Sequence, residues 1–526
     1  MTLFFLVSIS SVTLEIRTLE ASGNIYIRAD GSIDPAYALI STIDKGTYTF
    51  TGNMNDSIVV ERDNIVVDGS GYTVQGTGDV FSHGIDLTGR SNVTIKNMNI
   101  KAFGHGIDLS DSSGNNITGN NITDNNGDGI GLRSSSKNSV GGNNITDNNA
   151  GIYLNHYSNN NSVIGNNLSN NRNGISLYSS SNNSVSGNDI AANNEYGIYL
   201  NHYSNSNSLV GNNLTNNKGG IDLYSSSGNS VGGNTFFNCG LALQYSVEND
   251  VVDNLVNDKP LVYLENVSDT TVEDAGQVIL VNCNRITVEK LNLSHTAIGV
   301  ELWQTNNTKL GRNNIRDNNG GIYLYYSSNN SITENNVATC KRNGIYLEHS
   351  SYNSIGGNNV TNNGYGVVLE FYSNNNTVSG NNITANDYYG IELYSSCSEN
   401  SVSRNSITDN NLYGIWIDYS SSNIVYNNNF INNTQQIESY TSTNVWDDGY
   451  PSGGNYWSDY NGTDVNHDGI GDTPYMIDAN NTDHYPLMTS YIIPEFPPFL
   501  AVLLFTIATL LVVIVCRRKH VQRDQL

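Results

Sequence analysis

The sequence is short of positive charge. Lysine and arginine together number 24 against 49 aspartates and glutamates, so the formal net charge is −25. Proteins that bind nucleic acid or anionic lipid present basic surfaces, and we therefore expect neither partner here. Methionine is scarce as well, at five residues, and the nine histidines are scattered, which disfavours a copper site. Cations and neutral glycans remain as partners.

Apolar residues are also few. Hydrophobic residues make up 37% of the chain and charged residues 14%, while Asn, Ser and Gly fill much of what remains. Such a chain would struggle to build a globular core, but a solenoid needs only a thin continuous one. Disordered chains share this composition, and the strict repeat described next argues against disorder.

A short phrase recurs along most of the chain: Gly, an aliphatic residue, a variable residue and usually a second aliphatic. Its period is about 22 to 24 residues, which is typical of a solenoid. The anchor glycines are Gly84, Gly106, Gly129, Gly151, Gly174, Gly197, Gly220, Gly299, Gly321, Gly344, Gly366, Gly390 and Gly414.

Each period holds two more apolar units, Asn-Ser-Val and Gly-Asn-Asn-Ile-Thr or close relatives of them. All three units are too short for a helix, and their alternation of apolar and polar residues predicts short strands. Three strands per period, wound with the usual hand of parallel crossovers, predict an all-β, right-handed parallel β-helix. We place it at residues 59–440, with an irregular insertion near 251–299.

Asparagine dominates the predicted corners, where it tolerates the left-handed backbone conformation. The repeat also generates many Asn-Xaa-Ser/Thr sequons, so their asparagines are corner residues first and glycan acceptors second. These sequons include Asn121, Asn144, Asn167, Asn213, Asn292, Asn382 and Asn461.

The two ends predict a location outside the cell. Residues 1–20 include an apolar stretch that we interpret as a truncated signal peptide, with a buried first strand as the alternative. Residues 21–58 are interpreted as an N-terminal cap segment. A small cap at 441–490 and a linker at 491–498 precede an apolar run at 499–516, long enough to cross a bilayer. Because the tail at 517–526 is basic, it is predicted to be cytoplasmic and the β-helix extracellular.

Four cysteines fall in the predicted extracellular part: Cys239, Cys283, Cys340 and Cys397. Cys283 and Cys397 share one coil position but lie five coils apart, about 24 Å at the usual strand spacing and too far for a disulfide. We expect small unpaired residues.

Aromatic residues recur at the variable position of the Gly-aliphatic phrase. The positions are Tyr153, Tyr199, Tyr323, Tyr346 and, in the equivalent place, Trp416. This position points away from the core, so the rings are expected to form an exposed row on which sugar rings could stack. The alternative is that neighbouring rings pack on one another and cover the strand.

The predicted cap contains a calcium-like loop. Asp464, Asn466, Asp468 and Asp472 fall at alternating ligand positions, with Gly469 at the sixth position, as in a calcium loop. Tyr475 stands where the usual acid at position twelve would be. We expect calcium here, with a plain Asp-Gly turn as the alternative.

Catalytic signals are weaker. Asp86 and Asp108 lie one coil apart, too close for the carboxylate pair of an inverting glycosidase. His83 and His105 share one position on adjacent coils, which suggests a stacked pair or, as the lesser alternative, a metal site. The sequence leans against an enzyme and leaves catalysis open.

The Asn-rich coils, with the break at 258–264 and the segment 274–283, resemble the NosD-type β-helix family of carbohydrate-binding and sugar-hydrolase (CASH) repeats. Segments 25–35 and 58–76 are similar to archaeal surface members, and residues 494–497 (PEFP) resemble a PEF-type sorting signal. That likeness implies that an archaeosortase exchanges the membrane span for a lipid anchor. NosD itself is a periplasmic copper-binding maturation factor, a role that the scattered histidines and few methionines disfavour.

The sequence therefore predicts a cell-surface, membrane-anchored β-helix that binds or presents carbohydrate, with glycans or cell-envelope polymers as partners. A polysaccharide lyase, hydrolase or epimerase is the first alternative, and a NosD-like copper-binding maturation factor the second.

Overall fold

The computed structural model describes residues 23–492, which consist of strands and turns and contain no helix. No segment of these residues forms a helix with the length and apolar character needed to cross a membrane. The predicted signal peptide at 1–20, the motif at 494–497, the span at 499–516 and the tail at 517–526 lie outside the described residues. The chain divides into two compact units, Met1–Ser184 and Val185–Leu526, which are described separately.

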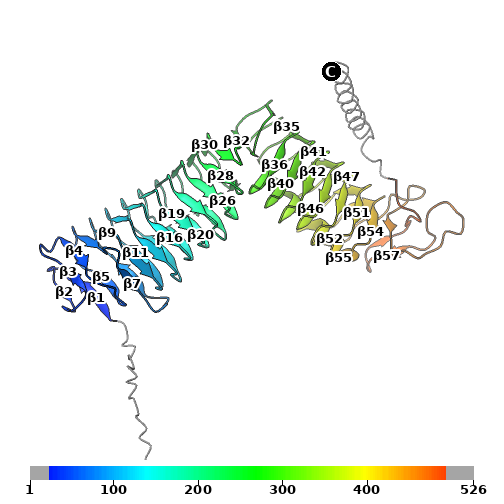
Figure 1. The fold of residues 1–526 in the computed structure, drawn as a ribbon. Helices are drawn as coiled ribbons and strands as arrows, with labels where there is room; N and C mark the ends of the chain where they lie inside the picture. The colour runs from blue at the N-terminus through cyan, green and yellow to red at the C-terminus, as the bar shows by residue number, and fades with distance from the viewer. Residues whose placement is uncertain (1–22, 493–526) are drawn as a thin grey trace, which may run out of the picture. The chain divides into compact units, whose positions relative to one another are not determined.

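Each regular coil contains three strands, as β11 (His105–Ser110), β12 (Asn116–Thr118) and β13 (Asn121–Thr123) illustrate. Equivalent strands of successive coils pair in parallel in three series, which we call sheet 1 (the longest strands), sheet 2 and sheet 3 (Figure 1). Each series is interrupted once in unit 2, at the change of stacking described below. Right-handed winding completes a parallel β-solenoid of about 18 turns, as the repeat predicts.

In unit 1, the edge strands β2 (Ile33–Asp34) and β3 (Ile40–Ser41) pair antiparallel with β1 and β4. Sheet 1 comprises β1 (Asn24–Ile27), β5 (Ser57–Val60), β8 (His83–Asp86), β11, β14 (Asp128–Arg133), β17 (Ala150–Asn155) and β20 (Asn173–Tyr178). Sheet 2 comprises β4 (Thr47–Phe50), β6 (Val66–Asp68), β9 (Thr94–Lys96), β12, β15 (Ser139–Gly141) and β18 (Ser162–Ile164), and β21 (Ser184–Ser186) lies at the unit boundary. Sheet 3 comprises β7 (Thr73–Gln75), β10 (Asn99–Lys101), β13, β16 (Asn144–Thr146) and β19 (Asn167–Ser169).

In unit 2, sheet 1 comprises β23 (Tyr196–Asn201), β26 (Gly219–Tyr224) and β29 (Leu241–Gln244), then β34 (Gln277–Val281), β37 (Ile298–Trp303), β40 (Gly320–Tyr325), β43 (Asn343–Glu348), β46 (Tyr365–Glu370), β49 (Tyr389–Tyr394), β52 (Tyr413–Asp418) and β55 (Gln435–Tyr440). Sheet 2 comprises β24 (Ser208–Val210), β27 (Ser230–Gly232) and β30 (Asp250–Val252), then β33 (Thr271–Val272), β35 (Thr287–Glu289), β38 (Lys309–Gly311), β41 (Ser331–Thr333), β44 (Ser354–Gly356), β47 (Thr377–Ser379), β50 (Ser401–Ser403) and β53 (Ile424–Tyr426). Sheet 3 comprises β22 (Asp189–Ala191), β25 (Asn213–Thr215), β28 (Thr235–Phe237) and β31 (Leu255–Val256), then β36 (Asn292–Ser294), β39 (Asn314–Arg316), β42 (Asn336–Ala338), β45 (Asn359–Thr361), β48 (Asn382–Thr384), β51 (Ser406–Thr408), β54 (Asn429–Ile431) and β56 (Tyr456–Trp457).

The regular stacking changes at β32 (Lys259–Glu265). This strand pairs antiparallel with β31 of sheet 3 and parallel with β34 of sheet 1. The later coils of unit 2 therefore stack on β32, which runs opposite to β31. The free edge of β29 has no parallel strand partner among the described residues.

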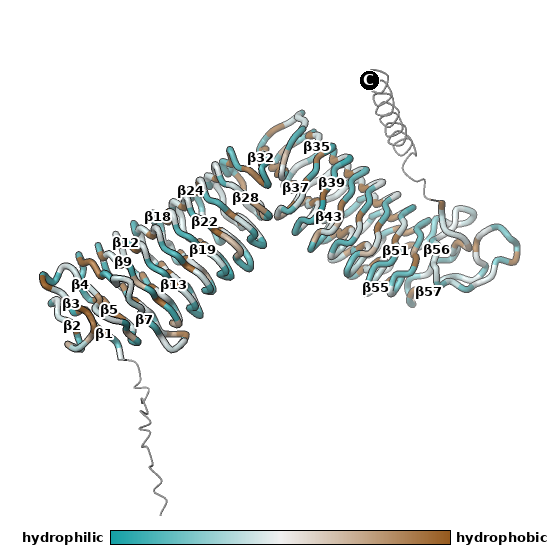
Figure 2. The backbone as a smooth tube through the Cα atoms, in the orientation of Figure 1, coloured by the Kyte–Doolittle hydropathy of each residue, from teal (hydrophilic) through white to brown (hydrophobic). Residues whose placement is uncertain are grey.

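The core is a stack of aliphatic side chains in register. Ile107, Ile130 and Ile152 are paired from coil to coil, and all three are fully buried. Figure 2 colours the coils by hydropathy and shows hydrophobic positions (brown) interspersed with hydrophilic ones (teal). Each anchor glycine lies against the next coil: a Cβ on Gly151 would come within 2.6 Å of the Gly174 carbonyl oxygen and 2.7 Å of Leu168. Glycine recurs at this position of the repeat because a side chain would meet the next coil.

The asparagines have a second role that the sequence analysis missed. Many of them are buried and form ladders, in which the side-chain oxygen accepts bonds from the asparagine one coil earlier. Asn143, for example, accepts from the backbone N–H and the Nδ2 of Asn120, both at 3.0 Å, and donates from Nδ2 to the Ile117 carbonyl at 2.9 Å. Left-handed backbone occurs instead at other corner positions, such as Asn97, Asp124 and Asn170.

A cap closes the last coil. Trp457 stacks between Phe430 and Tyr475, each with ring centroids 4.4 Å away. The buried Asp483, on the short hairpin of β57 (Tyr475–Met476) and β58 (Thr482–Asp483), accepts bonds from Asn455 N at 2.7 Å and Trp457 Nε1 at 2.9 Å. Its carboxylate thus ends one asparagine ladder.

Candidate functional site

The variable position of the Gly-aliphatic phrase lies on the outer face of sheet 1, but two of its tyrosines are not exposed. Tyr323 is 7% exposed and Tyr346 is 9% exposed, so the prediction that these rings are exposed is wrong. They lie 5.1 Å apart between ring centroids, and both contact the ring of Tyr325. At these two positions neighbouring rings pack on one another, which was the alternative to an exposed row of rings. Tyr153, Tyr199 and Trp416 are partly exposed.

A group of exposed aromatics lies instead at the corners that follow several of the sheet 1 strands. Tyr326 is 40% exposed and Tyr372 is 60% exposed, and both have positive φ, as do His349 and Phe371. His349 stacks on Tyr326 at 4.7 Å and on Tyr372 at 5.9 Å. The same corner has positive φ in other coils, as at Ser179, Ser225 and Gln304, so the conformation belongs to the repeat and is not particular to the rings. We call Tyr326, His349, Phe371 and Tyr372 the corner aromatics.

A cavity of about 200 Å³ opens on the outer face of sheet 1 in unit 2, where β26 and β29 face β37 and β40. It combines aromatic surface with charged groups of both signs. The lining side chains include those of Glu195, Tyr196, Lys218, Asp222, Tyr323, Tyr325 and Arg342.

Side chains take the place of a strand along the free edge of β29. Gln277 accepts from the N–H of Leu241 at 3.1 Å and donates from Nε2 to its carbonyl at 2.6 Å. Trp303 donates from Nε1 to the carbonyl of Leu243 at 3.0 Å. Glu301 accepts from Leu243 N at 3.4 Å and from Trp303 Nε1 at 2.9 Å. These buried groups satisfy the backbone N–H and carbonyl groups of the edge.

Two carboxyl groups near the free edge of β29 have raised pKa values. Burial raises the pKa of Asp222 to about 7, although the positive charge of Arg342 opposes the shift. Burial also raises the pKa of Glu301 to about 8, despite its hydrogen bonds from Trp303 and Leu243, and the charge of Asp222 adds to the rise. Of these two groups only Asp222 lines the cavity, so a ligand there can reach Asp222 but not Glu301. A carboxyl group with a pKa near neutrality can act as acid or base.

More carboxylates continue along the outer face of sheet 1. The Tyr346 hydroxyl lies 2.9 Å from Glu348 Oε2 and 2.8 Å from Glu370 Oε2, and the Tyr245 hydroxyl donates to Glu348 Oε1 at 3.1 Å. Burial, with the neighbouring Glu370 charge, raises the pKa of Glu392 to about 8. The face thus combines rings and acids beyond the cavity.

The sequence analysis missed Asp222, Glu301 and Glu392, although the repeat contained the signal. Each occupies the variable position, after Gly220-Ile221, Gly299-Val300 and Gly390-Ile391 respectively. Comparing this position across all coils for acids as well as aromatics would have found them. The presence of Arg342 in the cavity could not be predicted in this way, because Arg342 lies at a corner and not at the variable position.

In unit 1, the structure pairs His105 with His83 and Asp108 with Asp86 on β11 and β8, which confirms the expected shared positions. The two imidazole rings lie 5.6 Å apart at an interplanar angle of 81°. They therefore meet edge to face.

The predicted calcium loop folds around its own carboxylates. Asp464 accepts from Gly469 N at 2.9 Å, Asp468 from Ile470 N at 2.9 Å and Asp472 from Val465 N at 2.7 Å. Gly469 has φ of 88°, which supplies the sharp turn. Asn466 donates from Nδ2 to Asp468 Oδ2 at 2.9 Å. A bound calcium ion at these residues remains a prediction.

All four cysteines of the β-helix are buried and unpaired, which confirms the expectation of small unpaired residues. They are Cys239, Cys283, Cys340 and Cys397.

Two family models match the chain. Residues 83–236 match the right handed beta helix region, and residues 265–462 match the periplasmic copper-binding protein NosD. The segment that matches NosD contains no methionine, and its two histidines, His295 and His349, do not share a metal-ligand cluster within the described residues. Because its three cysteines are buried with raised thiol pKa values, this segment does not fit a copper centre.

No curated protein sequence matches the chain. Among solved structures, DFA-IIIase from Arthrobacter chlorophenolicus A6 is 17% identical with a TM-score of 0.33, over 45% of this chain and 64% of the enzyme. The periplasmic alginate epimerase AlgG, as a double mutant, is 13% identical with a TM-score of 0.28, over 81% and 83%. The Dettilon tailspike protein is 13% identical with a TM-score of 0.29, over 73% and 62%. These likenesses add nothing on function. The two family matches, together with the observed coils, support a NosD-like family of right-handed parallel β-helices for this chain.

Proposed function

We propose that this chain binds carbohydrate on the outer face of sheet 1 in unit 2. The observation that carries the proposal is the cavity at Asp222, in which tyrosine rings stand beside carboxylate, ammonium and guanidinium groups. Sugars need both kinds of contact, since their faces stack on aromatic rings while their hydroxyls exchange hydrogen bonds with polar groups.

The cavity continues into the corner aromatics through direct ring contacts. Tyr325 lines the cavity and stacks on Trp303 at 4.3 Å, and Trp303 contacts Tyr326 at 6.2 Å. Tyr326 then stacks on His349. At about 200 Å³ the cavity is smaller than a typical drug-sized site of about 300–1,000 Å³, so it suits one residue of a longer glycan whose neighbours lie on the corner aromatics.

A glycan array tests this proposal. Full-length protein is applied with and without calcium, beside the variants Asp222→Asn and Arg342→Gln, which keep side-chain size while removing charge. The proposal predicts binding to a polymeric glycan, with at least about tenfold weaker binding in one or both variants, equivalent to about 1.4 kcal/mol. Binding that both variants retain in full would place the ligand elsewhere, and an absence of binding across the array would contradict the proposal.

A second candidate function is acid–base catalysis on the bound polysaccharide, and the raised pKa of Asp222 favours it. Product analysis after incubation with each array hit separates the two functions. Turnover that Asp222→Asn abolishes, with binding kept, would make Asp222 the catalytic acid or base. Binding without turnover would leave a binding protein.

The proposed setting is the outer surface of the cell, where the chain would contribute to envelope structure or adhesion. The net charge of −25 is compatible with neutral or cationic envelope polymers. Membrane anchoring through residues 499–516 and archaeosortase processing are part of this proposal and rest on the sequence pattern.

A further inference from the structure

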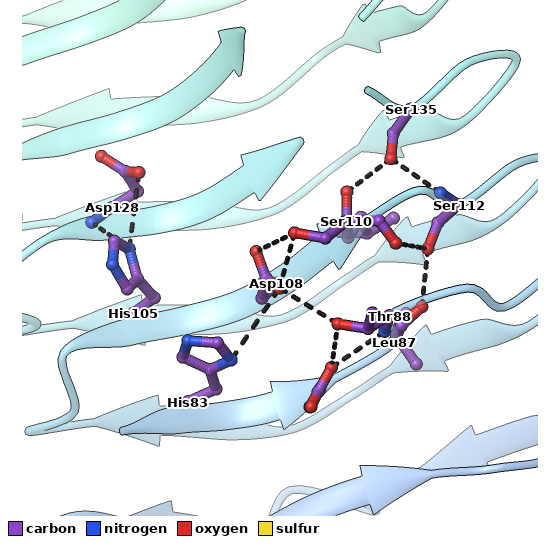
Figure 3. Close-up of polar contacts among 11 residues, drawn as sticks. His83, Leu87, Thr88, His105, Asp108, Ser110, Ser112, Asp128 and Ser135 are labelled. Atoms are coloured by element: carbon purple, nitrogen blue, oxygen red, sulfur yellow. Dashed lines mark hydrogen bonds and ion pairs between the residues drawn. The ribbon is translucent and has the colours of Figure 1, made fainter. Parts of the chain in front are cut away.

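A cluster of histidine and aspartate side chains lies on the outer face of sheet 1 in unit 1, apart from the proposed carbohydrate site. His83 and Asp86 are on β8 and Asp108 is on the next strand, β11. Ligand atoms of these three side chains all lie within 4.8 Å of one another, and in the described part of the chain no other set of three or more His, Cys, Asp or Glu does so. The His83 Nδ1 atom is 3.8 Å from Asp108 Oδ2 (Figure 3).

Neighbouring hydroxyl groups hold the carboxylates in place. Thr88 donates from its hydroxyl to Asp86 Oδ1 at 2.6 Å and lies 3.4 Å from Asp108 Oδ2. The Ser110 hydroxyl is 3.2 Å and 3.0 Å from the two oxygens of Asp108. Figure 3 shows Thr88 and Ser110 on either side of Asp108. Outer groups of this kind orient the ligands of metal sites.

The cluster places two carboxyl side chains next to each other. Asp86 and Asp108 are direct partners on adjacent parallel strands, where two like charges destabilise the pairing. Within residues 23–492, neither carboxylate forms an ion pair with a lysine or arginine, and the ion-pair partner of Asp108 is His83. The side chains of Asp86 and Asp108 lie about one strand spacing apart. A bound cation would neutralise them.

We propose that His83, Asp86 and Asp108 bind a divalent transition-metal ion, for which Zn²⁺ is the probe. Imidazole nitrogen suits Zn²⁺ but not Ca²⁺, which takes oxygen ligands. Three ligand atoms about 2.1 Å from the ion would lie roughly 3.4 Å apart in a tetrahedral site, so small side-chain rotations bring these groups into position.

Three protein ligands leave one position of a tetrahedral ion open. A cavity of about 150 Å³, lined by His83, His105, Asp108, Arg133 and Tyr153 among others, lies beside the cluster. Arg133 places a positive charge on this cavity, so the open position suits water or an anionic oxygen ligand. This site is independent of the proposed carbohydrate site, which lies in the other unit.

Equilibrium dialysis of the full chain, produced without a histidine tag and stripped of metal, tests the proposal at pH 7.5 with Zn²⁺ in the presence of excess Ca²⁺. The variants are His83→Gln and Asp108→Asn. The matched controls are His156→Gln and Asp124→Asn, which make the same chemical changes at other positions of unit 1. Circular dichroism and the midpoint of thermal unfolding follow folding in each variant.

The proposal predicts one equivalent of Zn²⁺ per chain in wild type and in both controls, and at least about tenfold weaker binding in His83→Gln and Asp108→Asn. Zn²⁺ should also raise the unfolding midpoint of wild type and of neither cluster variant. Equal Zn²⁺ binding in all five proteins, or displacement of the ion by Ca²⁺, would overturn it. Should Asp108→Asn fail to fold, the partly exposed His83 still gives the decisive comparison.

Discussion

At the level of single residues, the buried asparagines join successive coils by hydrogen bonds from their side chains, as the backbone does within the strands. Their side chains bond to the backbone of the coil before and to the asparagine side chain of the coil after, so each coil is tied to its neighbours at the corners as well as along the strands. Adjacent asparagines of one coil can differ in burial: Asn143 is buried and Asn144 is exposed. A substitution at Asn144 therefore serves as a matched control for the same substitution at Asn143.

Asn143→Ala should lower stability far more than Asn144→Ala. Asn143 is buried, and its removal leaves the Ile117 carbonyl and the Asn120 N–H without their partners. Each buried group left unsatisfied costs about 1–3 kcal/mol, so we expect a loss of about 2–5 kcal/mol. Asn144 is exposed and bonds only to Asn121 and Asn167, so its loss should cost less than about 1 kcal/mol. Urea unfolding measures both, and equal losses would contradict the ladder's role.

Stability should fall as the pH rises from 5 to 8, in part through Glu301. Folding raises the pKa of this group from its ordinary value of 4.5 to about 8, so the folded chain keeps a proton that the unfolded chain releases. The contribution is complete below pH 4.5 and is lost as the pH rises through 8, at up to about 1.4 kcal/mol per pH unit. Asp222 acts in the same direction up to a pH of about 7.

Glu301→Gln should weaken this pH dependence, because an amide keeps an oxygen acceptor and does not titrate. Urea midpoints at pH 5, 6, 7 and 8 measure the effect. The control Glu399→Gln changes an exposed corner residue and should keep the wild-type dependence. Parallel curves for wild type and Glu301→Gln would show that Glu301 is ionised in the folded chain.

At the scale of elements, the repeat fixes how strands stack. The Gly-aliphatic period predicted the parallel β-helix, and the pairing of Ile107, Ile130 and Ile152 follows it residue by residue. The repeat could not predict which outward rings are covered, since that depends on neighbours from other coils. Tyr323 and Tyr346 follow the same phrase as Tyr153, yet adjacent rings bury them.

The reversal of chain direction at β32 could not be predicted from the repeat either. It occurs where the period breaks, and a break shows where regular stacking stops without showing what replaces it. The side-chain bonds of Gln277, Glu301 and Trp303 to β29 join residues that are 36 to 60 positions apart. Long-range polar contacts of this kind leave no periodic signal.

Gly151→Ala should destabilise the coils, whereas Gly131→Ala should be tolerated. A methyl group at Gly151 would lie 2.6 Å from the Gly174 carbonyl oxygen, so strands of adjacent coils would have to separate. At Gly131 the nearest atom would be 3.6 Å away, an ordinary contact. We expect a cost of about 1–3 kcal/mol for the first change and less than about 0.5 kcal/mol for the second, from urea unfolding. A similar outcome for both would contradict close coil packing as the reason for the anchor glycine.

At the scale of the whole molecule, the end of the solenoid needs protection because an open coil exposes unpaired strand edges. The buried Trp446 and Trp457 and the carboxylate of Asp483 provide that closure. The loop containing Asp464 and Asp468 belongs to the same cap, so an ion bound there would stabilise the end of the chain.

Calcium at 1 mM should therefore raise the thermal unfolding midpoint of wild type, and a chelator should reverse the rise. Asp464→Asn with Asp468→Asn should abolish the calcium response, because amides bind Ca²⁺ less strongly than carboxylates do. Asp253→Asn, an exposed acid outside the loop, serves as the control. A calcium response that persists in the loop double variant would place the ion elsewhere, and no response in wild type would favour a plain turn.

The proposed carbohydrate site extends over unit 2, from the cavity at Asp222 to the corner aromatics. Its most direct test is isothermal titration of full-length protein with the strongest array hit, comparing wild type with Tyr326→Ala/Tyr372→Ala. Tyr157→Ala is the control, since this tyrosine is 75% exposed at an equivalent corner in unit 1. We predict a loss of at least about tenfold in affinity for the double variant, from about 1–2 kcal/mol of lost ring stacking, and an unchanged affinity for the control. Unchanged affinity in the double variant, or an equal loss in the control, would contradict the claim.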